Sequence, residues 1–250
     1  MRIAIKIAYD GNNFYGYARQ PQLRTVEGEL IKGLIKHGII EDTNDSCFRS
    51  ASRTDKGVSA LCNVVAFNTN SSKSNILEKL SEEFTDIIVY AIKNVNPDFN
   101  PRYAKNRQYR YNLIITNHDV NKIITAASCF TGQHNFTNFA RVEEFRDPVR
   151  AVDNIIFTQK NNTLIIDFYA QTFLWNQVRR IISALDKVGL GKLQKDQIVE
   201  ALSNPDKDFD FGVSPPESLI LKNIIYDFDF EIFKKGKTKL TNFENKLISL

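Results

Sequence analysis

The sequence predicts an α+β protein in which helices back a mostly antiparallel sheet. Three observations lead to this class. Strand-like segments outnumber helix-like ones, helices interrupt the runs of strands without strict alternation, and two strands flank an Asn161-Asn162 turn that is typical of a hairpin. A strict strand–helix alternation would have indicated a parallel sheet instead.

The first half of the chain alternates strands with two helices. Residues 2–9 place isoleucine at every second position, which is the period-two pattern of a half-buried strand. Residues 25–37 carry apolar side chains at helical spacing, and Gly38 provides a C-terminal stop. The remaining elements of this half are a strand at 62–68, a helix at 74–84 and a strand at 86–95.

The second half begins after a candidate seam at residues 99–105, which contains Pro101. We therefore expect an N-terminal subdomain over 1–105 and a C-terminal subdomain over 106–250. The lysine-rich tail after Phe233 is expected to be a solvated extension. The expected elements are strands at 107–115, 151–159, 163–170 and 219–230, and helices at 173–188 and 194–202.

Composition excludes several classes of protein. A chain of 250 residues with 42% hydrophobic and 25% charged residues is too apolar for wholesale disorder. Its three cysteines are widely spaced, so neither a disulfide framework nor a zinc site is expected. No secretory signal pattern or long apolar stretch is present, which predicts a cytoplasmic protein without membrane contact. The net charge of +4 is compatible with an anionic partner.

The most unusual local sequence is residues 51–60, which place Arg53, Asp55 and Lys56 beside Gly57. A hydrophobic core cannot use such a segment, so it must be a loop. A cation close to a carboxylate favours the ionised form, so the loop is a candidate site for carboxylate chemistry. The same composition also suits an ordinary solvated turn.

Residues 102–111 interleave tyrosines with basic side chains. Aromatic faces for bases and cations for phosphates are what binding of single-stranded RNA requires. An amphipathic, tyrosine-rich strand explains the pattern equally well. In the helix at 173–188, Arg179 and Arg180 flank the apolar stripe, where they could reach solvent or pair with a buried carboxylate. No phosphate-binding glycine motif and no metal-ligand spacing is present, so neither cofactor nor metal is expected.

At these segments the chain resembles the TruA family of tRNA pseudouridine synthases, nearly from end to end. Ser52-Arg53-Thr54-Asp55-Lys56-Gly57-Val58-Ser59-Ala60 is similar to the catalytic loop of that family. The chain departs from the usual motifs at Tyr17, Ser52, Ser59, Gln177 and Ser218. The other matching segments are Tyr9-Asp10-Gly11, Phe14 to Tyr17, Thr25 to Leu30, Tyr109-Arg110-Tyr111, Phe173 to Arg180 and Ser214 to Leu221.

The resemblance implies an isomerase that converts uridine to pseudouridine in the anticodon stem-loop of tRNA, usually at positions 38–40, without cofactor or metal. It also implies a homodimer. The implied fold has two subdomains, each similar to the ferredoxin or RNA-recognition fold, joined into one mostly antiparallel sheet around a central catalytic cleft with helices on the outside.

The resemblance also implies residue roles. Asp55 would be the catalytic carboxylate, acting as a nucleophile at C1′ or as the base that removes the C2′ proton. Arg179 would pair with Asp55, Tyr109 would stack on the uracil, and Leu219 would line the other side of the pocket. Arg53 would help to extrude the nucleotide from its stack. The candidate RNA contacts are Arg53, Lys56, Arg102, Lys105, Arg107 and Arg110.

Three alternatives remain. A non-catalytic tRNA-binding protein on the same scaffold is disfavoured because Asp55, Tyr109 and Arg179 are all retained. The same reaction on a different RNA or a different position fits the sequence as well, because target choice depends on RNA shape. A metal-dependent hydrolase would need further ligands beside Asp55, and none is recognisable.

Overall fold

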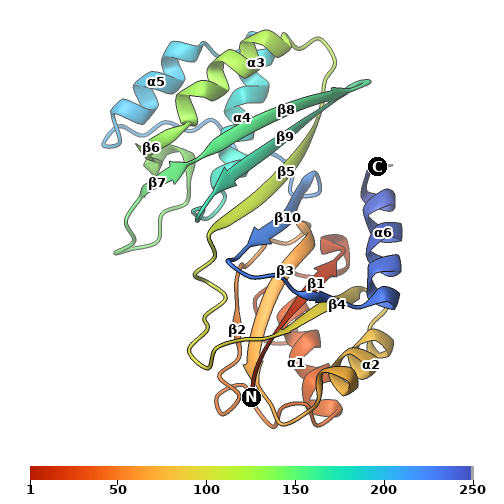
Figure 1. Ribbon diagram of the computed structural model, residues 1–250. Helices are drawn as coiled ribbons and strands as arrows, with labels where there is room; N and C mark the ends of the chain where they lie inside the picture. The colour runs from red at the N-terminus through yellow and green to blue at the C-terminus, as the bar shows by residue number, and fades with distance from the viewer. Residues whose placement is uncertain (249–250) are drawn as a thin grey trace. The chain divides into compact units, whose positions relative to one another are not determined.

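The structure is a computed structural model, and its described part is residues 1–248. The chain forms two compact units (Figure 1). Unit 1 comprises Met1–Lys105 and the chain from Ile220 on, and unit 2 comprises Asn106–Leu219. The sequence-based boundary assigned the last segment to the C-terminal subdomain, and the final two residues of that assignment lie outside the described part.

The sheet of unit 1 is built on three long strands. Strand β1 (Arg2–Tyr9) lies between β3 (Ser59–Asn68) and β4 (Ile87–Asn94), and it is antiparallel to both. The short β2 (Arg49–Ser50) pairs with β3, which gives the order β4-β1-β3-β2. Two late segments extend this sheet: β11 (Glu231–Ile232) pairs with β4, and β10 (Leu219–Ile225) runs parallel to β3.

Two helices of unit 1 match the sequence expectation closely. Helix α1 (Val26–Lys36) begins after Thr25, whose side chain accepts a hydrogen bond from the Gly28 amide. Helix α2 (Lys73–Glu83) is capped by Ser72 in the same way and packs against β4. A short 3-10 helix, η1 (Gly11–Asn13), follows β1 and is capped by Asp10.

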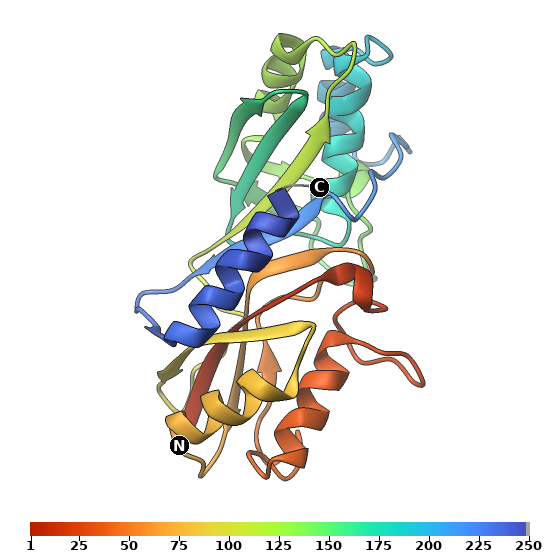
Figure 2. The same ribbon diagram turned by 90° about the vertical axis from the view of Figure 1, so that its right-hand side faces the viewer.

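The C-terminal segment corrects two expectations. Helix α6 (Lys234–Ile248) replaces the expected solvated tail and packs over the sheet of unit 1 (Figure 2). Leu240 and Phe243 contact a cluster that contains Ala8 and Tyr90. The expectation that residues 2–9 are half-buried is therefore wrong, because α6 covers the face on which Ala8 lies and β1 is buried on both sides.

Unit 2 contains an antiparallel sheet in the order β5-β9-β8. Its strands are β5 (Asn106–Ile114), β8 (Asn154–Lys160) and β9 (Thr163–Ala170), and the last two form the hairpin that Asn161-Asn162 predicts. Helix α4 (Gln177–Gly189) packs against α3 (Val120–Ala127). The remaining elements are α5 (Lys195–Ser203), a small sheet of β6 (Gly132–Asn135) and β7 (Val149–Val152), and the short helices η2 (Ser128–Phe130) and η3 (Thr137–Phe139).

The α+β class and the mostly antiparallel pairing are confirmed. Four predicted elements have clearly different bounds. The strand expected at 62–68 begins at Ser59, and the strand expected at 151–159 is divided between β7 and β8. The helix expected at 173–188 begins only at Gln177, because Asn176 adopts a left-handed conformation with φ +60°. The strand expected at 219–230 ends at Ile225. Within residues 1–248, no helix combines the length and the apolar character needed to cross a bilayer.

Candidate active site

The loop that carries Asp55 is fixed at both ends. At its start, the Ala51 amide donates to the Val64 carbonyl over 2.8 Å. At its end, the Val58 amide donates to the Asp55 carbonyl over 3.1 Å, and Gly57 closes this turn with φ +84°. Asp55 is partly exposed, whereas its neighbours Arg53 and Lys56 are exposed, so the sequence-predicted loop presents all three side chains near the surface of unit 1.

A buried polar network lies under this loop. The hydroxyl of Tyr9 lies 2.8 Å from Thr54 Oγ1. The fully buried Asn63 amide reaches the same hydroxyl at 3.4 Å and donates to the Ser52 carbonyl at 2.9 Å. The Ser52 amide donates back to Asn63 Oδ1 over 3.3 Å. Because these groups are buried and satisfied by one another, they hold the backbone before Asp55 in one conformation.

The segment after β1 holds the other side of the loop. The Tyr17 amide donates to the Thr54 carbonyl over 3.0 Å. Gly16 adopts φ +94°, and a methyl group there would lie 3.3 Å from the backbone amide nitrogen of Lys56. A methyl group at Gly11 would overlap the Val58 carbonyl. The two glycines are therefore required so that this segment can lie directly against the Asp55 loop.

Two departures from the family motifs have structural roles here. Ser59, which replaces a frequent histidine, accepts a hydrogen bond from the Gly11 amide over 3.0 Å. Tyr17, which replaces a frequent tryptophan, is fully buried and donates to Ser50 Oγ over 2.7 Å. Burial raises the pKa of Tyr17 well above its ordinary value. Both side chains thus stabilise the structure around the loop.

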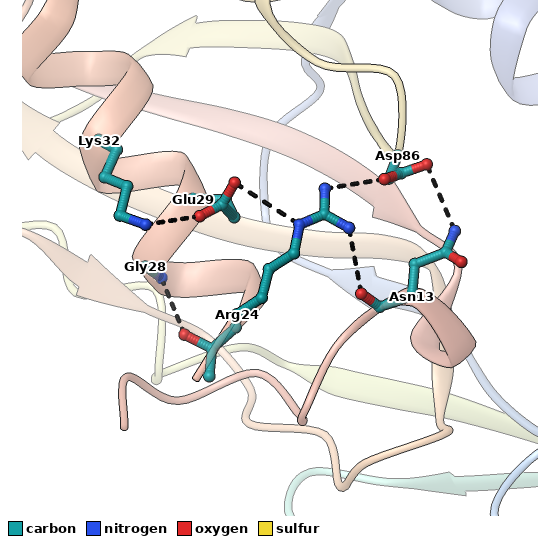
Figure 3. A network of polar contacts seen from close by, with 7 residues as sticks. Asn13, Arg24, Gly28, Glu29, Lys32 and Asp86 are labelled. Carbon is teal, nitrogen blue, oxygen red and sulfur yellow. Dashed lines mark hydrogen bonds and ion pairs between the residues drawn. The ribbon is translucent and has the colours of Figure 1, made fainter. Parts of the chain in front are cut away.

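Arg24 connects this segment to the start of β4 (Figure 3). Its guanidinium donates to the Asn13 carbonyl over 3.1 Å and to Asp86 Oδ2 over 2.8 Å. The Asn13 side chain also donates a hydrogen bond to Asp86 Oδ1 over 3.3 Å, so the three residues contact one another. Glu29 lies 3.6 Å from Arg24 Nε. Arg24 was not predicted from the sequence, because nothing in the sequence pairs it with partners 11 and 62 positions away.

Tyr109 lies on β5 in unit 2, opposite Phe168 on β9. Its ring is partly exposed and meets the edge of Phe173, with 5.3 Å between the ring centroids and an interplanar angle of 85°. Such an edge-to-face contact fixes the plane of the tyrosine ring. An aromatic ring held in this way can present a stacking surface.

Arg179 lies in the first turn of α4 and does not simply extend to solvent. Its Nε donates to the Ser214 carbonyl over 2.7 Å, and its Nη1 donates to Asn176 Oδ1 over 3.2 Å. The Ser214 amide donates back to the Arg179 carbonyl over 3.1 Å. The neighbouring Arg180 instead lies 3.3 Å from the exposed Asp210. Of the two arginines, Arg179 is the one whose guanidinium the surrounding chain orients.

The closing motif has Ser218 in the place of the usual glycine. Ser218 is not among the residues with positive φ, so a side chain is tolerated there. Its carbonyl accepts a hydrogen bond from the Asn112 amide over 3.1 Å, and Tyr111 donates to the Pro215 carbonyl over 3.2 Å. Burial raises the pKa of Tyr111 above its ordinary value. Leu219 follows and is 6% exposed.

The six candidate RNA contacts fall into two groups. Arg107 is buried and donates to the Gln171 carbonyl, while Arg110 makes two hydrogen bonds to Asp167, of 2.9 and 2.7 Å. These two guanidiniums are committed to partners inside unit 2. The exposed members are Arg53, Lys56, Arg102 and Lys105, of which Lys105 forms an ion pair with Asp227.

The structure therefore gathers Arg53, Asp55 and Lys56 on one loop of unit 1, and it holds Tyr109, Arg179 and Leu219 in unit 2. The pairing of Asp55 with Arg179 stays a prediction. Within the described residues, no group of three or more His, Cys, Asp or Glu side chains is arranged to hold a metal ion.

Among solved structures, the crystal structure of a Cbf5-Nop10-Gar1 complex matches 74% of this chain and 45% of that chain, at 14% identity and a TM-score of 0.37. A family model described as tRNA pseudouridine synthase matches residues 126–227.

Curated relatives match over nearly the whole length. The tRNA pseudouridine synthase A of Thermococcus sibiricus is 44% identical over 100% of both chains. That of Pyrococcus abyssi is 44% identical over 96% of this chain and 90% of its own. That of Methanobrevibacter smithii is 38% identical over 90% of this chain and 83% of its own. At this identity and coverage, the chain belongs to the tRNA pseudouridine synthase A (TruA) family, whose members are isomerases that convert uridine to pseudouridine.

Proposed function

We propose that the protein isomerises uridine to pseudouridine in the anticodon stem-loop of tRNA, at positions 38–40, with Asp55 as the catalytic carboxylate. The observation that carries this proposal is the geometry of the Asp55 loop. Buried hydrogen bonds from Tyr9 and Tyr17 fix Thr54, and the next residue presents a partly exposed carboxylate between two exposed cations. A preorganised reactive group beside phosphate-binding side chains is what modification of a nucleotide requires.

The reaction breaks the bond between N1 of the uracil and C1′ of the ribose and forms a bond between C5 and C1′. The hydrogen on C5 is lost as a proton at the end. Asp55 acts at the ribose, either as the nucleophile at C1′ or as the base that removes the C2′ proton. Both routes begin from the carboxylate form, and neither consumes a cofactor.

Tyr109 stacks against the uracil while the base is detached and turned. Support for this role comes from the edge-on contact with Phe173, which fixes the ring plane. Arg179 orients Asp55, and Leu219 lines the pocket. In support of the role of Arg179, its guanidinium is held by the Ser214 carbonyl and by Asn176. Arg53 is exposed and helps to extrude the target nucleotide from its stack.

The substrate is held by phosphate contacts and, as the family resemblance implies, by a homodimer. The exposed side chains of Arg53, Lys56, Arg102 and Lys105 contact the phosphates. The internal hydrogen bonds of Arg107 and Arg110 favour a positioning role for those two, on the strand β5 that also carries Tyr109. Binding of tRNA is therefore expected to weaken steeply as the salt concentration rises.

The test uses the wild-type protein and unmodified tRNA transcripts that carry tritium at C5 of uracil, without added metal. Tritium is released only when C5 becomes bonded to the sugar. We expect release, with pseudouridine mapped to positions 38–40 by carbodiimide-dependent stops in reverse transcription. Salt-dependent tRNA binding without release would favour a non-catalytic binding protein. Release with stops at other positions would contradict the anticodon assignment.

A further inference from the structure

Tyr15 is the exposed member of a group of three aromatic side chains in unit 1. Phe14 is 2% exposed and Tyr17 is fully buried, whereas Tyr15 between them is 49% exposed. The ammonium of Lys56 lies over the Tyr15 ring, 4.5 Å from its centroid. Lys56 is the residue directly after Asp55, so a surface aromatic side chain and a cation stand together beside the proposed catalytic carboxylate.

The backbone under Tyr15 is rigid. The Tyr15 amide donates to the Arg24 carbonyl over 2.9 Å, and its carbonyl accepts a hydrogen bond from Gln20 over 2.8 Å. Asn13, two residues before Tyr15, is tied to Arg24 and Asp86 in the network of Figure 3. On the other side, Gly16 lies against the backbone of Thr54 and Lys56. A ring on such a support loses little freedom when a ligand binds to it.

The charge around this ring favours a nucleic acid over an apolar partner. Arg53 and Lys56 are both exposed, and Asp55 is the only acidic residue in the loop from 51 to 60. Aromatic rings next to lysine or arginine bind unpaired nucleotides, because the ring stacks on the base while the cation meets the phosphate. When a nucleotide is extruded from the stack, each neighbouring base loses a stacking partner.

We propose that Tyr15 and Lys56 form a stacking site for the unpaired nucleobase that flanks the target uridine in the RNA. This inference rests on the proposed function, because it takes the tRNA as the substrate. The Tyr15 ring replaces the stacking that the flanking base loses when the uridine is extruded, and Lys56 contacts the adjacent phosphate. The pair thus stabilises the extruded state of the substrate, while Asp55 performs the chemistry.

The first test compares Tyr15→Leu and Tyr15→Phe by their kinetics on unmodified tRNA transcripts. We expect Tyr15→Leu to raise KM by about 10-fold, with kcat at saturating tRNA nearly unchanged, because one base–aromatic stack is lost. Tyr15→Phe keeps the ring and is expected to retain the wild-type KM. Phe145→Leu is the matched control, since it removes a 98% exposed aromatic ring from unit 2.

The second test combines Tyr15→Leu with transcripts that carry one abasic nucleotide on either side of the modified uridine. If Tyr15 stacks on one of these bases, the abasic change at that position and Tyr15→Leu are strongly non-additive in tRNA affinity. In the same assay, Lys56→Gln is expected to reduce the slope of log affinity against log salt by about one. Additive effects at both positions would overturn the stacking site.

The two proposals fail in different ways. If the wild-type protein releases no tritium from tRNA, the proposed function fails and the stacking site fails with it. If the wild type is active and Tyr15→Leu matches it in KM and affinity, only the stacking site is overturned. Equal unfolding midpoints in urea for Tyr15→Leu and the wild type exclude misfolding as the cause of a raised KM.

Discussion

The Tyr9 hydroxyl lies 2.8 Å from Thr54 Oγ1, so the last residue of β1 is bonded to the residue directly before Asp55. Both side chains are buried, and Asn63 on β3 reaches the same hydroxyl. The central strand of unit 1 and the Asp55 loop therefore form one rigid assembly. Removal of this contact should therefore lower both the free energy of unfolding and the turnover.

Tyr9→Phe tests that coupling. The change deletes one hydroxyl and leaves the buried Thr54 and Asn63 groups with one partner fewer, so we expect the free energy of unfolding to fall by about 1–3 kcal/mol. Turnover on tRNA should fall as well, because the loop loses its anchor. Urea denaturation and tritium release measure the two effects. Tyr103→Phe is the control, since Tyr103 is 82% exposed; equal behaviour of the two variants would contradict the anchoring role.

A comparison of Gly16→Ala with Gly38→Ala separates the effect of backbone strain from the effect of a crowded contact between residue 16 and the Asp55 loop. Gly16 and Gly38 both have positive φ, at +94° and +62°, so alanine strains the backbone at either position. A methyl group at Gly16 would also lie only 3.3 Å from the backbone nitrogen of Lys56, whereas nothing lies within 4 Å of one at Gly38. We expect each variant to lose about 1 kcal/mol of stability. Only Gly16→Ala should lose activity, and a parallel loss in Gly38→Ala would refute the explanation.

Asp167→Ala tests the structural role of Arg110. The carboxylate is 9% exposed and accepts both hydrogen bonds from the guanidinium, so its removal leaves a largely buried cation without its partner. We expect a loss of about 3 kcal/mol in the free energy of unfolding. Lys32→Gln breaks the exposed pair with Glu29 and should cost at most about 1 kcal/mol. Urea denaturation that gave equal losses would show that the Arg110 pair behaves as a surface pair.

Alkaline pH should destabilise the protein through its buried tyrosines. Burial raises the pKa of Tyr17 and of Tyr90 well above 10.0 in the folded chain. Above about pH 10 the unfolded chain releases these protons while the folded chain keeps them, so stability falls as the pH rises. Urea denaturation at increasing pH measures this slope, and Tyr17→Phe should make it shallower. An unchanged slope in that variant would show that Tyr17 does not contribute.

The fold was predictable wherever the pattern is local. The helical spacing after Thr25 and the Asn161-Asn162 turn each identify an element within a few residues of its true bounds. Helix α6 was missed because its many lysines mask Leu240, Phe243 and Leu247, whose spacing places them on one face. The return of the chain from Ile220 to the sheet of unit 1 depends on pairing with β3, and no local pattern encodes that pairing.

In the candidate site too, only features with a local sequence pattern could be predicted. Asp55, Tyr109 and Arg179 were predicted as site residues because they stand in family motifs, and their roles stay predictions. The residues that support Asp55 were not identified, since Tyr9 and Thr54 are 45 positions apart and Arg24 meets Asp86 across 62 positions. Composition also suggested RNA contacts at Arg107 and Arg110, whose guanidiniums the fold engages internally. Only the tertiary structure separates a cation that is held internally from one that is exposed.

Tritium release from C5-labelled tRNA by the wild type and by Asp55→Ala, measured beside their tRNA affinities, tests the central claim most directly. Asp55 is partly exposed on a loop whose backbone other residues hold, so its truncation should leave the fold and tRNA binding intact. We predict release by the wild type and none by Asp55→Ala at equal affinity. Release by Asp55→Ala at even a few per cent of the wild-type rate would contradict the assignment of Asp55 as the catalytic carboxylate.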